Sequence, residues 1–222
     1  AENAPLVVMG GTHTVDVTKY LAEGCTLTEN EGTYTVQEDQ AVQVGDQYYG
    51  TLERAFANAG QGDTVKLLAD IELTETQDVT VADITLDLNG KTISGSVSST
   101  GLIRVGNGAS LTVTDLSSAE TKGTITNTAS SLPYCLRIEE GSTLTLERGV
   151  NITDAGDSPS GAAVYVYPNT SGTNLPVLTV KNANLTSAKG FPIKGRSSFY
   201  VATVNIEGGY FAAESKNATT SL

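Results

Sequence analysis

The stretch Ile84-Thr-Leu-Asp-Leu-Asn-Gly-Lys-Thr-Ile-Ser-Gly95 decides how the rest of the chain is interpreted. Ile84, Leu86 and Leu88 alternate with polar residues, which is the pattern of a half-buried strand. The Asn-Gly pair then turns the chain before a second extended run. Asn-Gly between two alternating runs is also the strongest short signal for a hairpin, which would make the sheet antiparallel. The stretch therefore predicts two short strands and leaves open how they pair.

Similar runs recur towards the C-terminus in sets of three short strands separated by turns. Leu111, Leu144, Leu178 and Val204 occupy the same position in four successive sets, at intervals of 33, 34 and 26 residues. A repeat made only of strands cannot bury its own apolar side, whereas stacked repeats bury one another's. The repetition therefore favours an all-β fold, a right-handed parallel β-helix with three short strands per coil, over a sandwich built from hairpins.

Residues 51–59 predict a helix instead. Thr51 is a suitable N-cap, and a glycine follows the last turn. A single amphipathic helix has to lay its apolar side against the strands that follow it. We therefore expect a β-helix domain over residues 48–222, capped by this helix and preceded by a small strand-rich appendage or linker over residues 1–47. The apolar side chains that share one face of the helix are Leu52, Ala55, Phe56 and Ala59.

Composition excludes several classes of partner. The 222 residues carry 13 Lys and Arg against 25 Asp and Glu, a formal net charge of -12. Such a chain repels a phosphate backbone, so nucleic acid is not expected as a partner. No run approaches the ~20 apolar residues that cross a bilayer, and no membrane insertion is expected. Cys25 and Cys135 lack metal-ligand spacing, and two buried free thiols are expected rather than a disulfide.

Three motifs carry a resemblance to a known family: Tyr49-Gly-Thr-Leu-Glu-Arg-Ala-Phe, Gly62-Asp-Thr-Val-Lys-Leu-Leu and Leu86-Asp-Leu-Asn-Gly-Lys-Thr-Ile. From about Tyr48 onward the chain resembles the pectin-lyase-like β-helix modules of large surface proteins of gut Gram-positive bacteria. The resemblance implies an extracellular location, at the cell surface or secreted. It also implies a non-enzymatic, adhesin-like or stalk module whose partners are host or dietary glycans or host surface proteins.

The two ends of the chain carry related motifs. Met9-Gly-Gly-Thr and Glu207-Gly-Gly-Tyr each follow an apolar run. In the resembled family a turn of this kind closes one module, so the resemblance implies that residues 1–47 are the tail of a preceding repeat unit. We therefore expect a monomer within a longer multi-module chain.

Tyr165 and Tyr167 are the first candidates for ligand binding. They alternate with Val164 and Val166, so if the valines point inward the tyrosines point outward together. Two outward rings on one strand can stack on sugar rings, and packing between neighbouring coils is the structural alternative. Arg196 is also expected on an outward face and joins the ligand-binding candidates.

Asp154 and Asp157 lie in a turn that contains Gly, Ser and Pro. Its oxygens could hold calcium, although such a turn needs no ligand to form. No other cofactor is expected. The single histidine, His13, is far from this turn in sequence, so no acid–base pair can be assembled and no enzymatic activity is expected. Arg137 or Arg196 as the base of a lyase keeps the alternative open, a polysaccharide lyase or glycosidase on the same scaffold.

Overall fold

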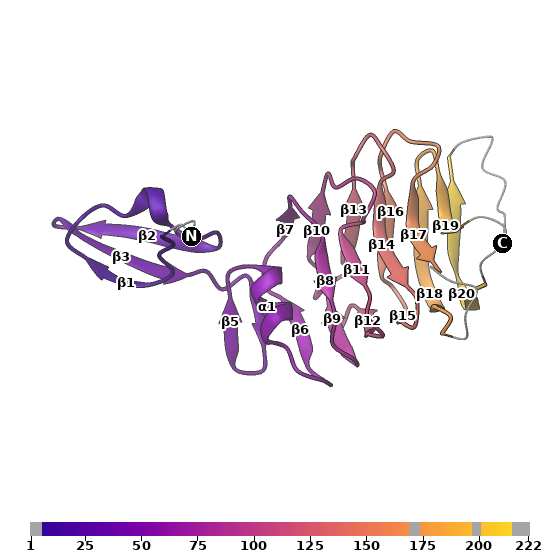
Figure 1. Ribbon diagram of the computed structural model, residues 1–222, viewed down its shortest axis with the longest axis horizontal. Helices are drawn as coiled ribbons and strands as arrows, with labels where there is room; N and C mark the ends of the chain where they lie inside the picture. Colours follow the sequence, from indigo (N-terminus) through magenta and orange to yellow (C-terminus); the bar gives the residue numbers. More distant parts are fainter. Residues whose placement is uncertain (1–5, 169–173, 197–200, 215–222) are drawn as a thin grey trace, which may run out of the picture.

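The computed structural model describes residues 6–168, 174–196 and 201–214, and this part of the chain is mostly β with a single α-helix. Successive sets of strands follow one another along the long axis of the molecule, from helix α1 (Leu52–Asn58) to strand β20 (Thr203–Ala213) (Figure 1). Among the described helices, none has the length and apolar character that crossing a membrane requires. The expectation of an all-β chain is confirmed.

A small antiparallel sheet forms the N-terminal part, with its three strands in the order β1-β3-β2. Its elements are β1 (Gly11–His13), the 3-10 turn η1 (Thr18–Tyr20), β2 (Cys25–Asn30) and β3 (Thr33–Glu38). The sheet has a hydrophobic cluster of its own, made of Val17, Ala22, Cys25 and Val36. This cluster is separate from the core that the following strands share.

The remaining strands form two sheets whose neighbours are parallel, except that β4 pairs antiparallel with β5 and β6. The larger sheet contains β4 (Val42–Val44), β5 (Gln47–Tyr49), β6 (Thr64–Leu67), β7 (Ile71–Leu73), β9 (Ile84–Asp87), β10 (Thr92–Gly95), β12 (Ser110–Thr114), β13 (Thr124–Asn127), β15 (Thr143–Leu146), β16 (Asn151–Asp154), β18 (Val177–Ser187) and β20 (Thr203–Ala213). The smaller sheet contains β8 (Gln77–Val79), β11 (Ile103–Val105), β14 (Tyr134–Glu139), β17 (Ala162–Tyr167) and β19 (Phe191–Gly195).

The Asn89-Gly90 turn does not make a hairpin. Strand β9 pairs with β6 and β12, whereas β10 pairs with β7 and β13, so the two strands of the opening stretch never pair with each other. Both turn residues have positive φ, 48° and 73°, and the Asn89 side-chain amide donates to the Leu67 carbonyl, 2.8 Å away. The antiparallel interpretation is therefore wrong, because the turn is anchored to the preceding β6 segment and directs the chain into another row of strands.

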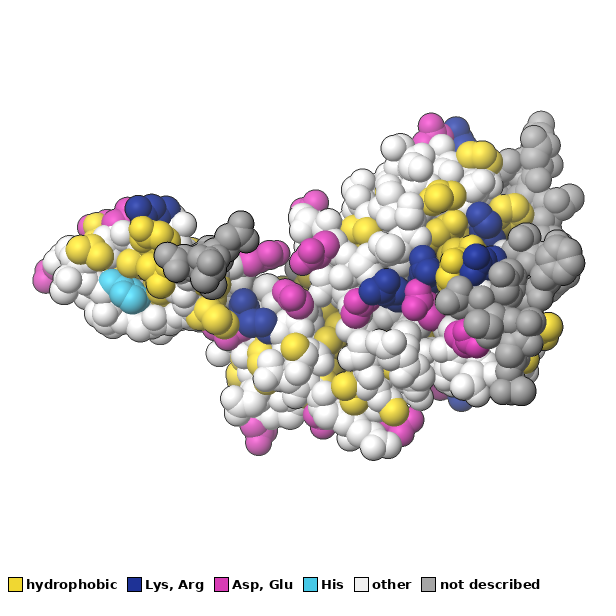
Figure 2. Space-filling view, viewed as in Figure 1, with side chains coloured by type: hydrophobic (Ala, Val, Ile, Leu, Met, Phe, Trp, Pro, Cys, Tyr) yellow, Lys and Arg dark blue, Asp and Glu magenta, His cyan; other side chains and the backbone are white. Residues whose placement is uncertain are grey.

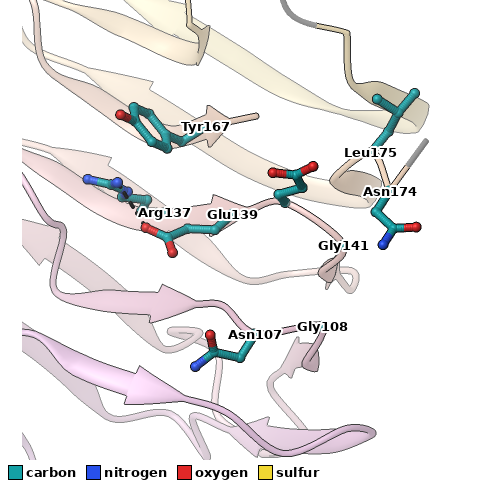
Figure 3. A pocket seen from close by; sticks show the side chains of 9 residues that line it. Asn107, Gly108, Arg137, Glu139, Gly141, Tyr167, Asn174 and Leu175 are labelled. Atoms are coloured by element: carbon teal, nitrogen blue, oxygen red, sulfur yellow. Dashed lines mark ion pairs between the residues drawn. The ribbon is translucent and has the colours of Figure 1, made fainter. Parts of the chain in front are cut away.

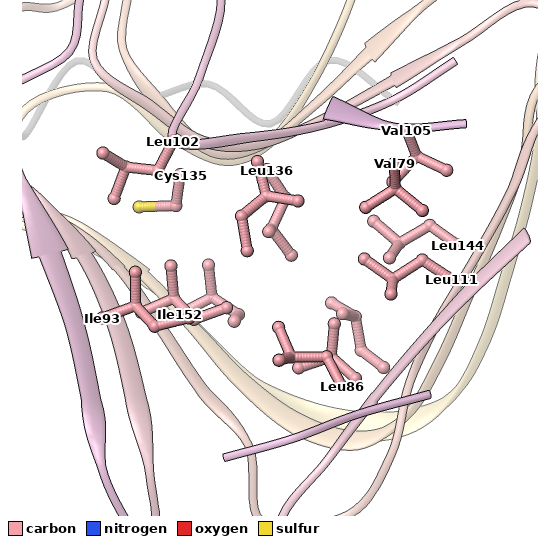
Figure 4. Close-up of a cluster of buried hydrophobic side chains, with 14 of the residues drawn as sticks. Val79, Leu86, Ile93, Leu102, Val105, Leu111, Cys135, Leu136, Leu144 and Ile152 are labelled. Carbon is pink, nitrogen blue, oxygen red and sulfur yellow. The ribbon is translucent and has the colours of Figure 1, made fainter. Parts of the chain in front are cut away.

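Successive strand sets align their apolar residues in rows. Leu111 pairs with Leu144, Leu144 with Leu178, and Leu178 with Val204, which is the register that the sequence intervals predict. A second row contains Ile93, Ile125, Ile152 and Leu185. The buried side chains of these rows converge on one core between the sheets (Figure 4). Each fully buried aliphatic side chain stabilises the fold by about 1.5–3 kcal/mol relative to leaving it exposed.

Helix α1 (Leu52–Asn58) lies one residue inside the predicted limits at each end. The Thr51 side chain caps it by accepting a hydrogen bond from the Arg54 backbone N–H. Leu52, Ala55 and Phe56 are buried, and the helix contacts β4, β5 and β8 at the N-terminal end of the larger body. The predicted helix is therefore present, with its apolar face on the strands.

The two hydrophobic clusters meet at a small polar junction. Arg54 of α1 pairs with Glu38 at the end of β3, with 2.7 Å between Nε and Oε1, and donates from Nη2 to the Glu23 carbonyl. Gly24 and Gly50 touch through their backbones, so closely that a Cβ on either would clash. Strand β4, inside the range predicted for the appendage, belongs to the larger sheet. Both cysteines are free and buried, as expected, one in each cluster.

Candidate functional site

The outer face of the smaller sheet gathers most of the candidate residues. On β17, Val164 and Val166 are buried while Tyr165 and Tyr167 are partly exposed, so the predicted orientation of the tyrosines is confirmed. The strand register continues this row of outward side chains across the sheet. Arg104 is aligned with Arg137, Arg137 with Tyr165, and Tyr165 with Lys194. Basic and apolar side chains alternate on this face (Figure 2).

The tyrosines pack against one another. The ring of Tyr134, on β14, stacks on Tyr165 with centroids 4.3 Å apart, and Tyr165 meets Tyr167 edge to face at 5.4 Å. Burial raises the pKa of the Tyr134 hydroxyl to about 12 and also raises that of Tyr165. Both hydroxyls therefore remain protonated at neutral pH and can donate hydrogen bonds.

Two guanidinium groups cover the ring of Tyr167. The Arg137 Cζ lies 4.0 Å from the ring centroid and the Arg196 Cζ 4.4 Å from it. They come from the two sides of β17, since Arg137 is on β14 and Arg196 directly follows β19. Cation–π contacts of this kind contribute about 0.5–2 kcal/mol each. Tyr167 therefore holds two cations in place and offers less of its own face for stacking on a sugar.

Carboxylates form ion pairs with two of the arginines on this face, Arg137 and Arg104. Glu139 pairs with Arg137 at 2.8 Å, and Asp78 pairs with Arg104 through two hydrogen bonds of 2.6 and 2.7 Å. The Arg137 Nη1 also donates to the Ser99 carbonyl. Its Nε is buried and has no acceptor among the described residues. Arg137 is thus fixed by neighbours while one of its donors is left without a partner.

Lys194 completes the cationic row. Its ammonium group donates to the Ser160 carbonyl at 2.7 Å, lies 3.4 Å from the Tyr134 hydroxyl, and sits over the rings of Tyr134 and Tyr165. Burial lowers the pKa of this lysine. The aromatic neighbours partly compensate for the lost hydration of the ammonium group.

An open groove adjoins this face (Figure 3). Arg137, Glu139 and Tyr167 line one part of it, and the turns after β11 and β14 and the segment before β18 line the rest. The lining residues are Asn107, Gly108, Arg137, Glu139, Glu140, Gly141, Tyr167, Asn174 and Leu175. The groove therefore gives a ligand access to the Arg137–Tyr167 contact from the solvent.

The two predicted aspartates, Asp154 and Asp157, lie outside this face. Asp154 is fully buried at the end of β16, where it accepts hydrogen bonds from the Ser187 hydroxyl and the Gly156 N–H, and burial raises its pKa. Asp157 is exposed and pairs with Lys189. No group of three or more His, Cys, Asp or Glu side chains with metal-binding geometry occurs in the described part. Asp154 is therefore buried and Asp157 points to solvent, so the two carboxylates do not form one exposed site.

Sequence reasoning overlooked part of this face, namely Tyr134, Arg104 and Lys194. A usable signal was present, because four successive repeats have equivalent segments: Leu102-Ile-Arg-Val, Leu136-Arg-Ile, Val164-Tyr-Val-Tyr and Pro192-Ile-Lys. Residues at equivalent places in stacked repeats lie side by side on one face. Aligning the repeats residue by residue would have placed these cations next to the tyrosines.

The chain was compared with models of protein families, with curated proteins and with solved structures. None of the three comparisons found a match.

Proposed function

We propose that this chain is a non-enzymatic extracellular module of a bacterial cell-surface protein, adhesin-like or a stalk, built as a right-handed parallel β-helix and binding glycans on the outer face of the smaller sheet. The parallel pairing of successive strand sets, with apolar rows at repeat spacing, supports the β-helix. The module belongs in this proposal to a longer chain of similar units at the cell surface.

One observation carries the binding proposal. Four of the 13 lysines and arginines, in a chain of net charge -12, share one sheet face with three tyrosines: Arg104, Arg137, Lys194 and Arg196 beside Tyr134, Tyr165 and Tyr167. Gathering like charges on one face is unfavourable unless neighbours or a ligand compensate for it, and Asp78 and Glu139 compensate in part by pairing with Arg104 and Arg137. The guanidinium covering of Tyr167 favours an anionic sugar, because arginine forks match carboxylate and sulfate oxygens.

A glycan array followed by calorimetry tests the proposal. The array contains neutral, carboxylated and sulfated glycans, and hits are titrated at low and high salt. We expect anionic glycans to bind, with affinity falling as salt rises. The Arg196→Ala variant should bind about tenfold more weakly, since a hydrogen bond to a charged group contributes about 1.5–3 kcal/mol. The pair Tyr165→Ala and Tyr167→Ala should also weaken binding.

Arg148→Ala is the matched control, because Arg148 is an exposed arginine on the turn between β15 and β16, outside the face. It removes the same charge and should leave the affinity unchanged. Equal losses in the Arg148 and Arg196 variants would contradict a defined site. An array without any hit would favour a purely structural spacer.

The alternative function is a carbohydrate-active enzyme, a polysaccharide lyase or glycosidase. Lys194 favours it, since a lysine whose pKa is lowered beside a tyrosine hydroxyl is a plausible proton acceptor. Assays for new reducing ends and unsaturated products, with and without calcium, separate the two functions. If the chain turns over a polysaccharide and the Lys194→Met variant does not, the function is catalysis rather than binding.

A further inference from the structure

The chain contains two Asn-Gly pairs, Asn89-Gly90 and Asn107-Gly108, in turns of similar backbone geometry. The asparagines have φ of 48° and 56°, and the glycines 73° and 76°. The two pairs therefore share sequence and backbone conformation and differ in their surroundings. That difference decides how each pair reacts.

Asn-Gly pairs undergo a known intramolecular reaction. The backbone nitrogen of the glycine attacks the side-chain amide carbon of the asparagine, a ring C–N bond forms, and the amide nitrogen leaves as ammonia. Water then opens the cyclic imide to aspartate or isoaspartate. Glycine favours the reaction because it has no side chain to shield the nitrogen or to restrict the backbone. A free N–H and a free amide are the structural requirements.

At Asn89-Gly90 both reacting groups are occupied. The Gly90 N–H donates to the Asp115 carboxylate at 2.9 Å, and the Asn89 amide donates to the Leu67 carbonyl at 2.8 Å. Both residues are only partly exposed. The attack therefore requires these hydrogen bonds to break in a local opening of the turn.

At Asn107-Gly108 both reacting groups are available. Both residues are exposed, and within the described part neither the Asn107 side chain nor the Gly108 N–H has a hydrogen-bond partner. A Cβ built on Gly108 would have no heavy atom nearer than the Gly141 carbonyl oxygen at 4.0 Å. The turn has room to change its backbone angles as the ring closes.

We propose that Asn107 is a spontaneous deamidation site that changes the charge of the groove. Asn107 lines the groove with Arg137 and Glu139 (Figure 3). It also lines a smaller pocket together with Arg104 and Asp78. Conversion places a new carboxylate at the edge of the cationic face. This consequence rests on the proposed function, because the new charge repels an anionic glycan and attracts the arginines that would hold it.

Peptide mapping by mass spectrometry tests the reaction. The folded chain is aged in neutral to mildly alkaline buffer, and the two Asn-Gly peptides are followed with separation of aspartate from isoaspartate. We expect Asn107 to convert at least about tenfold faster than Asn89. In denaturant the two pairs should convert at similar rates. Equal rates in the folded chain, or an Asn107 that keeps its amide, would overturn the proposal.

The charge effect has its own measurement. Fresh and aged chains, Asn107→Asp and Asn107→Gln are titrated with hyaluronan, dextran sulfate and uncharged dextran. The aged chain and Asn107→Asp should bind the anionic polymers several-fold more weakly than fresh chain, while aged Asn107→Gln keeps its affinity. Unchanged affinity after ageing would overturn the charge effect. If the fresh chain binds none of the polymers, the proposed function fails. The deamidation proposal is still tested in that case, by the ratio of the Asn107 and Asn89 conversion rates from mass spectrometry.

Discussion

At the scale of single residues, Asp115 is the buried carboxylate with the densest hydrogen bonding. It accepts from the backbone N–H groups of Gly90, Gly123 and Ser117 and from the Ser117 hydroxyl. Burial acts to raise its pKa, but the hydrogen bonds from Ser117, Gly123 and Gly90 together outweigh it, and the pKa is lowered. Asp115 thus joins the opening Asn-Gly turn to the turn of the next strand set.

Asp115 should therefore make stability depend on acidity. A carboxylate with a lowered pKa in the folded state contributes stability above its unfolded pKa of about 3.9, and this contribution is lost as pH falls below that value. Asp115→Asn should cost about 1–3 kcal/mol at pH 7 and flatten the loss of stability below pH about 4. Urea unfolding at several pH values measures both effects. Asp157→Asn, at an exposed carboxylate, is the control, and an equal cost there would contradict the assignment.

At the scale of elements, the short strands are stabilised mainly by the burial of their inward side chains. Strand β15 has four residues, of which Leu144 and Leu146 are fully buried between the rows of β12 and β18. Its outward Thr145 is aligned with Thr112 of β12 and Thr179 of β18. The stability of the element therefore resides in the apolar row.

Leu144→Ala should destabilise the protein by about 2–5 kcal/mol, because it removes transfer free energy and leaves a cavity in a close-packed row. Thr145→Ala, one residue along on the outward side, should cost less than about 1 kcal/mol. Chemical denaturation of both variants gives the comparison. Similar costs for the two substitutions would mean that the core row does not carry the stability of the strand.

At the scale of the whole molecule, the junction around Arg54 sets the orientation of the small sheet. Arg54 bonds to Glu38 and to the Glu23 carbonyl, and the Gly50 N–H also donates to Glu38, at 2.8 Å. The Gly24–Gly50 contact brings the two backbones together at the same place. In the multi-module chain proposed above, this junction would fix the angle between successive units.

Arg54→Ala should loosen the junction without unfolding either cluster. We expect small-angle scattering of the variant to show a broader distribution of interatomic distances than that of the unchanged chain, with circular dichroism unaltered. Glu53→Ala, at the neighbouring helix position, serves as the control. A scattering profile identical to that of the unchanged chain would show that the backbone contact alone sets the orientation.

The local period of the sequence determined the strands, the α1 helix and the inward or outward direction of residues such as Tyr165 and Leu144, because these properties depend on neighbours along the chain. Repeat spacing also determined the register of the Leu111 row. Only the tertiary structure decided that the Asn89-Gly90 turn joins two strands that do not pair with each other, and that Asp154 is buried against Ser187. It also decided that Arg137, Lys194 and Arg196 meet around Tyr165 and Tyr167. Those outcomes depend on hydrogen bonds and contacts between residues that are distant in sequence, which no local pattern specifies.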